Sequence, residues 1–120
     1  MMNRKSESGI KQPDVVWVNN GKKYAIEVEL TGKWKRDLNM FVMAVLRALL
    51  PTKGGEIIYA GCFILSDSEA ILARYKTAFR HGSVHDSWQK NTTRHWVKNG
   101  TFTIPKGIEE KLAWRKIDYK

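Results

Sequence analysis

The hydrophobic pattern at the start of the chain predicts a β-hairpin. Pro13 opens a β-branched and aromatic run over residues 14–18, and residues 23–30 alternate between apolar and polar side chains. Asn20-Gly21 lies between the two runs, and Asn-Gly in such a place is the strongest local signal for a tight hairpin turn. Two antiparallel strands are therefore expected.

A long amphipathic helix and a buried strand are expected next. Apolar side chains recur at three- and four-residue spacing from Trp34 to Leu49, and Pro51 ends the pattern. Residues 56–65 predict a strand that is apolar on both faces, as in a central strand covered on each side. Residues 66–80 begin with N-cap candidates and predict a second helix to about Arg80. The order β-β-α-β-α predicts an α/β fold with a mixed central sheet flanked by helices.

The two ends of the chain carry weaker patterns. Residues 1–12 are polar and indicate a flexible leader, which leaves residues 13–120 as a single domain. Beyond Gly82 we expect a small hairpin within residues 94–104, turning at Asn99-Gly100, and a short terminal helix over residues 108–117.

Charge adds a partner class to this picture. The 120 residues hold 21 Lys and Arg against 12 Asp and Glu, a net charge of +9. Between Arg74 and Lys98, six cations against Asp86 alone give +5. Clustered cations favour a polyanion such as DNA, although a solvated surface with surplus lysines explains such a run as well. The candidate DNA-binding residues are Lys35, Arg36, Arg74, Lys76, Arg80, Lys90 and Arg94.

The same composition bears on location. The longest apolar stretch, residues 40–50, is interrupted by Arg47 and is shorter than the ~20 residues that span a bilayer. The basic start has no apolar run behind it, so a secretory signal is not supported. A single cysteine, Cys62, cannot form an internal disulfide. We therefore expect a cytoplasmic protein with no membrane partner.

Three carboxylates form the candidate chemical centre. Glu27 and Glu29 share one side of the second strand, and counting outward from the hairpin turn places Asp14 opposite Glu27. An exposed strand face paired with lysines is the ordinary explanation of such a Glu-x-Glu. On a covered strand, however, two like charges repel unless a cation lies between them. Oxygen-only ligands suit Mg²⁺ or Mn²⁺.

These residues resemble a known superfamily. Pro13-Asp14, twelve intervening residues and Glu27-Val28-Glu29, followed by a helix and a buried strand, look like the motif of the PD-(D/E)xK restriction-endonuclease-like fold. The resemblance covers residues 13–80 and implies metal-dependent phosphodiester cleavage in nucleic acid. It implies that Asp14 and Glu27 are metal ligands. Residues 25–33 look more narrowly like a stretch of plasmid replication-relaxation proteins and mobilisation relaxases.

The chain departs from the superfamily motif at one position. Glu29 stands where the family usually has its catalytic lysine, and a glutamate cannot offer that positive charge. Glu29 is then a base or an extra ligand, as in some restriction enzymes, and Lys33 is the candidate for the displaced cation. An ordinary exposed lysine is the other interpretation of Lys33.

Three function classes follow. The leading one is a Mg²⁺- or Mn²⁺-dependent DNA endonuclease or nickase, with Asp14, Glu27, Glu29 and Lys33 as its centre. The others are a non-catalytic DNA-binding accessory module of the same fold and an adaptor for an acidic protein. A homodimer and a larger nucleoprotein complex are both kept open.

Several further residues carry two interpretations. His81 and His85 have the spacing of helical zinc ligands, but no third ligand is evident. Tyr75 is a packing tyrosine, a DNA contact or a covalent nucleophile. Trp88 and Trp96 lie among Lys90, Arg94 and Lys98 in the sequence. Aromatic rings interleaved with cations are typical of surfaces that bind a single nucleic-acid strand, but packing in the core explains the two tryptophans equally well.

Overall fold

A computed structural model describes residues 13–118, and the predicted leader over residues 1–12 lies outside them. Strands β1 (Val15–Asn19) and β2 (Lys22–Val28) form the expected antiparallel hairpin. Asn20 and Gly21 have φ angles of 53° and 79°, and positive φ at both central positions is what a type I′ turn requires. The turn chemistry therefore fixes the register of this hairpin.

The main sheet is mixed, as predicted. β2 runs parallel to β3 (Gly61–Ser66), and β3 runs parallel to β6 (Leu112–Lys116), which gives the strand order β1-β2-β3-β6. Helix α1 (Lys35–Leu49) connects β2 to β3, and helix α2 (Glu69–Ala78) follows β3. The α/β class and the order β-β-α-β-α are confirmed.

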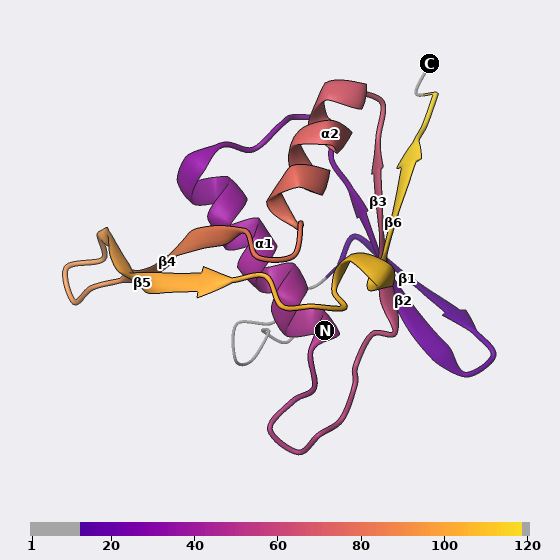
Figure 1. Ribbon diagram of the computed structural model, residues 1–120, viewed down its shortest axis with the longest axis horizontal. Helices are drawn as coiled ribbons and strands as arrows, with labels where there is room; N and C mark the ends of the chain where they lie inside the picture. The colour runs from indigo at the N-terminus through magenta and orange to yellow at the C-terminus, as the bar shows by residue number, and fades with distance from the viewer. Residues whose placement is uncertain (1–12, 119–120) are drawn as a thin grey trace.

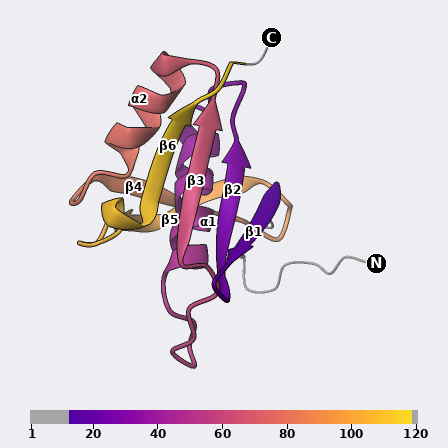
Figure 2. The same cartoon turned by 90° about the vertical axis from the view of Figure 1, so that its right-hand side faces the viewer.

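Both helices cover the same face of the sheet (Figures 1 and 2). The chain passes from β2 to β3 and on to β6 in one direction across the sheet, and right-handed crossovers in one direction place their helices on one side. The expectation of a sheet covered on both sides is therefore wrong. On the other face, the rings of Trp17, Tyr24 and Phe63 contact one another with centroids 5.3–6.1 Å apart, and Trp17 is 45% exposed.

The core lies between the helices and the sheet. The apolar side of α1 supplies Phe41, Val42 and Leu49, and α2 supplies Tyr75, which with Phe79 just beyond the helix is fully buried. Alternate residues of the strands complete the core on the helix-covered face. On β2 and β3 these buried residues are Ala25, Glu27, Cys62, Ile64 and Ser66.

A second hairpin packs across α1, and the sequence pattern misplaced it. Strands β4 (Val84–Lys90) and β5 (Trp96–Thr103) pair antiparallel, whereas a smaller hairpin turning at Asn99-Gly100 was expected. Asn99 and Gly100 instead lie within β5, where the register shifts, and Gly100 has a φ of 85°. A β-bulge needs such a glycine as much as a turn does, so the dipeptide alone does not distinguish the two.

The remaining differences concern element ends. The expected terminal helix over residues 108–117 is wrong: a short 3₁₀ turn, η2 (Glu109–Lys111), leads into strand β6. The predicted strand over residues 56–65 begins only at Gly61, although Tyr59 before it is buried. Among the described residues, no helix has the length and apolar character needed to cross a membrane.

Candidate active site

Two carboxylates are buried near the C-terminal end of β2. The side chains of Glu27 and Glu29 are 3% and 5% exposed, on the face of the sheet that the helices cover. The period-two pattern correctly put both on one side of the strand, and that side is the buried one. A buried carboxylate is costly unless hydrogen bonds or a cation compensate for its lost hydration.

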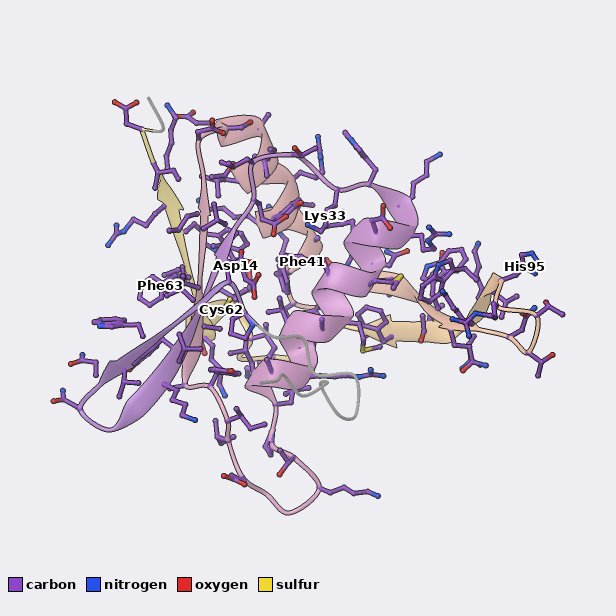
Figure 3. The ribbon with its side chains drawn as sticks, turned by 180° about the vertical axis from the view of Figure 1, so that it is seen from behind. Asp14, Lys33, Phe41, Cys62, Phe63 and His95 are labelled. Carbon is purple, nitrogen blue, oxygen red and sulfur yellow. The ribbon has the colours of Figure 1, made fainter. Side chains whose placement is uncertain are left out.

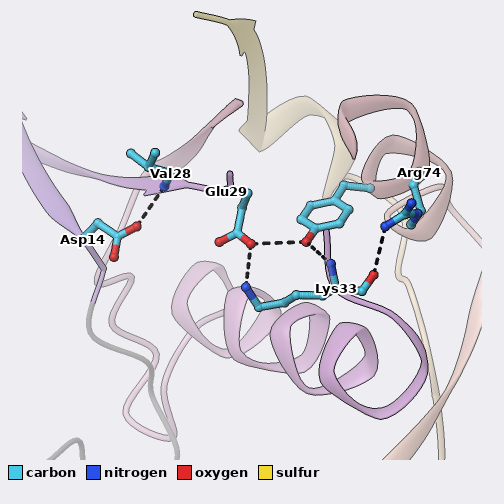
Figure 4. A network of polar contacts seen from close by, with 6 residues as sticks. Asp14, Val28, Glu29, Lys33 and Arg74 are labelled. Carbon is cyan, nitrogen blue, oxygen red and sulfur yellow. Dashed lines mark hydrogen bonds and ion pairs between the residues drawn. The ribbon is translucent and has the colours of Figure 1, made fainter. Parts of the chain in front are cut away.

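Glu29 is held by a lysine and a tyrosine (Figure 4). The Lys33 Nζ lies 2.5 Å from Glu29 Oε1, which also accepts a hydrogen bond from the Tyr75 hydroxyl at 3.2 Å. The same hydroxyl accepts a hydrogen bond from the Lys33 backbone N–H at 2.9 Å. Lys33 thus compensates the charge of the buried Glu29 carboxylate.

Tyr75 is a buried tyrosine whose hydroxyl is hydrogen-bonded within the protein. Burial is the main cause that raises the pKa of Tyr75 to about 12; the hydrogen bond from the Lys33 N–H and the charge of Arg74 act against this rise, and the charge and hydrogen bond of Glu29 contribute to it. The side chain has no exposed surface. Tyr75 therefore remains protonated near neutral pH and serves as a packed hydrogen-bond donor.

An arginine extends the positive charge towards solvent. Arg74 Nη1 donates to the Lys33 carbonyl oxygen at 3.2 Å, and its Cζ lies 3.3 Å from the centroid of the Trp34 ring. Trp34 is 62% exposed. The close approach depends on Gly32, because a Cβ there would lie 2.4 Å from Arg74 Nη1. We call Glu29, Lys33, Arg74 and Tyr75 the Glu29 cluster.

Asp14 lies at the neighbouring strand end. The ladder keeps the predicted register as far as Val15 opposite Ile26, and the next residues outward are Asp14 and Glu27. Asp14 Oδ2 accepts a hydrogen bond from the Val28 backbone N–H at 2.8 Å. Asp14 thereby points at the β2 backbone between the two glutamates, while Glu29 turns towards Lys33 (Figure 4).

Glu27 faces the interior beside α1. It lines a cavity of about 10 Å³ together with Pro13, Tyr59 and apolar residues of α1. That volume is close to the smallest that holds one water molecule. Burial raises the pKa of Tyr59, and the negative charge of Glu27 raises it further.

The three predicted ligands do not form one three-carboxylate site. Within residues 13–118, no three His, Cys, Asp or Glu side chains gather closely enough to hold a metal ion. Glu29 Oε1 forms an ion pair with Lys33 and accepts a hydrogen bond from Tyr75. Asp14 and Glu27 are the other two predicted ligands, and one or two carboxylates are the usual protein share of a Mg²⁺ site, with waters and substrate phosphate completing it.

The two histidines with zinc-like spacing, His81 and His85, are not part of a metal-binding group among the described residues either. His85 belongs to β4, where its Nε2 lies 2.7 Å from the Ala78 carbonyl oxygen and its Nδ1 lies 3.4 Å from Asn39 Nδ2. His81 is exposed in the turn before that strand. The two do not share a helix, so the helical zinc spacing is not realised.

The candidate DNA-binding cations divide into three groups. Arg74 joins the Glu29 cluster, whereas Arg36 and Lys90 both lie over the Trp96 ring, 5.4 and 5.2 Å from its centroid. The others are exposed at separate places on α1, on α2 and beyond, and on the β4–β5 turn: Lys35, Lys76, Arg80 and Arg94. Figure 3 places Lys33 near the sheet and His95 at the far end of the hairpin.

Two residues of the site were missed from the sequence. Trp34 was assigned to the buried side of the helix, but it is the N-cap of α1 and forms the platform for Arg74. The place of Trp34 just before the first turn of the helix was the signal in the sequence that could have identified it as the N-cap. Tyr59 was assigned to a regular strand, and nothing in its local pattern pointed to Glu27.

A scan against protein-family models, a search of curated proteins and a search of solved structures each find no match.

Proposed function

We propose that this protein is a Mg²⁺- or Mn²⁺-dependent DNA endonuclease or nickase with a restriction-endonuclease-like core. The observation that carries the proposal is the pair of buried carboxylates near the end of β2, with the Lys33 ammonium folded onto the second. Acidic oxygens and a lysine near one strand end are the kinds of group that the resemblance to the PD-(D/E)xK motif implies, although the lysine is Lys33 rather than the residue at position 29. The narrower link to plasmid mobilisation stays a prediction.

Asp14 and Glu27 are the residues that would hold the metal ion. Both offer only oxygen: Asp14 Oδ2 accepts a hydrogen bond from the backbone N–H of Val28, which follows Glu27 in the sequence, and Glu27 lines the small cavity beside α1. A bound divalent ion at such a site polarises a scissile phosphate and lowers the pKa of an attacking water. Asp14 is exposed and Glu27 is buried, so the pair links the interior of the domain to its surface.

The Glu29 cluster would supply positive charge to the phosphate. Lys33 is 33% exposed, which leaves its ammonium accessible to the charge that develops on a pentavalent phosphate. Glu29 and Tyr75 are positioning residues, because they fix Lys33 without facing solvent. Arg74, stacked on Trp34, offers a second cation to the DNA backbone.

A second candidate is a DNA-binding module that does not cleave. It is favoured by the Lys33–Glu29 ion pair, because a lysine that serves only to neutralise a buried glutamate needs no catalytic role. Under this alternative the acidic residues stabilise the fold and the surface cations bind DNA.

Cleavage of supercoiled plasmid DNA distinguishes the nuclease from the DNA-binding module that does not cleave. We expect the wild-type chain to produce open-circular or linear DNA with Mg²⁺ or Mn²⁺ and none with EDTA. The variant Glu27→Gln keeps the size of the side chain and removes its charge, so cleavage should fall at least a hundredfold while DNA binding in EDTA is retained. The matched control is Glu110→Gln, an exposed carboxylate on η2.

The outcomes are distinct. Loss of cleavage in Glu27→Gln, with activity kept in Glu110→Gln and an unchanged melting curve in both, supports the nuclease. DNA binding without any metal-dependent cleavage by the wild-type chain supports the non-catalytic module. Absence of DNA binding at low salt rejects both.

A further inference from the structure

A groove separate from the carboxylate site lies between α1 and the β4–β5 hairpin. It has a volume of about 260 Å³, somewhat below the ~300 Å³ at which pockets for drug-sized ligands begin. Such a size suits one flat ring system rather than a whole cofactor. The lining residues are Asn39, Met40, Met43, Ala44, Arg47, Asp86, Ser87, Trp88 and Trp96.

One of the two indoles in the groove is fixed by hydrogen bonds. Trp88 Nε1 donates to Asn39 Oδ1 at 3.1 Å, and Asn39 Nδ2 lies 3.4 Å from His85 Nδ1. The last link of this hydrogen-bond series is the Ala78 carbonyl oxygen, which lies 2.7 Å from His85 Nε2. When His85 donates from Nε2 and accepts at Nδ1, each of these three hydrogen bonds joins a donor to an acceptor. The Trp88 ring is therefore held in place before any ligand binds.

Cations surround both indoles. Arg36 and Lys90 lie over Trp96, and Lys98 lies 5.8 Å from the centroid of the Trp88 ring. Arg47 lines the groove as well. The acid among its lining residues, Asp86, pairs with Lys98 at 3.5 Å. The surroundings of the groove are thus positive, and they complement a ligand that joins a flat ring to phosphates.

We propose that this groove binds an unpaired base of single-stranded DNA by stacking on Trp96 and Trp88. Bases stack on aromatic side chains whatever their identity, while cations beside the rings bind the flanking phosphates. A cation over an exposed ring is held less strongly than a stacked base, so Arg36 and Lys90 can leave Trp96 for phosphates. The choice of DNA as the ligand rests on the proposed function, whereas the stacking surface is inferred from the geometry of the groove alone.

The inference deepens the proposed function by naming its substrate class. A duplex keeps its bases stacked inside the helix, so this groove favours strands that are already unpaired or locally opened. The protein would then hold a single strand between the hairpin and α1, and two residues of the Glu29 cluster, Glu29 and Lys33, lie just before α1 in the sequence.

Binding to oligo(dT), measured in EDTA by tryptophan fluorescence and anisotropy, tests the inference without cleavage. We expect oligo(dT) to quench the fluorescence and to bind more tightly than a duplex of equal length. Trp96→Ala should weaken binding about tenfold or more, and Trp96→Phe should restore most of it, because a phenyl ring still stacks. The matched control is Trp17→Ala, which removes an indole from the uncovered sheet face.

Failure of the groove and failure of the nuclease are distinguishable. If oligo(dT) binds and Trp96→Ala loses it while plasmid DNA is never cut, the groove stands and the nuclease does not. Unchanged affinity in Trp96→Ala, equal weakening in Trp17→Ala, or tighter binding to duplex overturns the groove even if plasmid DNA is cut.

Discussion

Lys33 folds back onto Glu29, with its ammonium 2.5 Å from the Oε1 atom of a carboxylate that is only 5% exposed. The two residues are four apart in sequence, but they lie on the connection between β2 and α1 rather than on one helix. The pairing explains how the fold tolerates Glu29 in its interior. It also places a cation near the C-terminal end of β2, the strand that carries Glu27.

A double-mutant cycle measures this pairing. Lys33→Gln should lower the free energy of unfolding by about 1–3 kcal/mol, because it leaves a buried carboxylate without its cation. Glu29→Gln should cost less, since Lys33 is partly exposed to water. We expect a coupling energy of at least about 1 kcal/mol from urea unfolding at neutral pH.

The exposed ion pair of Lys98 and Asp86 provides the control. Its side chains are 63% and 40% exposed, and exposed pairs contribute ~0.2–1 kcal/mol. A Lys33–Glu29 coupling no larger than that of the exposed pair would show that the buried carboxylate does not depend on Lys33.

Tyr75 predicts a loss of stability at alkaline pH. Burial raises the pKa of Tyr75 to about 12 in the folded protein, against about 10 for an exposed tyrosine. Between these values the folded state binds the proton more tightly than the unfolded state. The stabilisation is therefore complete below pH 10 and is lost as the pH rises towards 12.

Tyr75→Phe isolates this effect from the titration of lysines. At pH 8 the variant should be less stable by about 1.5–3 kcal/mol, because the Glu29 carboxylate, a charged acceptor, loses the hydrogen bond that the Tyr75 hydroxyl donates. The difference between wild type and variant should shrink between pH 10 and pH 11.5 in urea unfolding. A difference that stays constant over this range contradicts the raised pKa.

Gly32→Ala should displace Arg74 from Trp34. The added methyl group would lie 2.4 Å from Arg74 Nη1 and 3.3 Å from Ile71 Cγ1, so the arginine must move. We expect a modest loss of stability, of the order of 1 kcal/mol, and weaker DNA binding with a shallower salt dependence. Gly54→Ala is the control, because the nearest atom to its added Cβ is Thr52 Oγ1 at 4.0 Å. Equal DNA affinity and salt dependence in the two variants would remove Arg74 from the proposed interface.

The sequence predicted those parts of the fold that depend on local chemistry. The Asn20-Gly21 turn set the β1–β2 register, and the apolar spacing of α1 ended at Pro51 as expected. Coverage of the sheet was wrong because it depends on the direction of both crossovers. That direction was undetermined until β6 was known, and residues 112–116 were assigned to a helix.

The site was predictable to a similar degree. Alternation along β2 put Glu27 and Glu29 on one face, and Lys33 emerged as a candidate from its place after the strand. The contacts of Glu29 with Tyr75 could not be predicted, because they join residues 46 positions apart. Such long-range hydrogen bonds depend on how α2 packs, and no local pattern encodes that packing.

We propose that Asp14 and Glu27 hold a divalent metal ion against a DNA phosphate. Electron paramagnetic resonance of Mn²⁺ tests it directly, because ions bound to the protein disappear from the spectrum of free Mn²⁺. With a short oligonucleotide present, the wild-type chain should remove about one ion per chain beyond the DNA alone, and the double variant Asp14→Asn, Glu27→Gln should remove none. Equal Mn²⁺ binding by the wild type and the folded double variant would contradict the account.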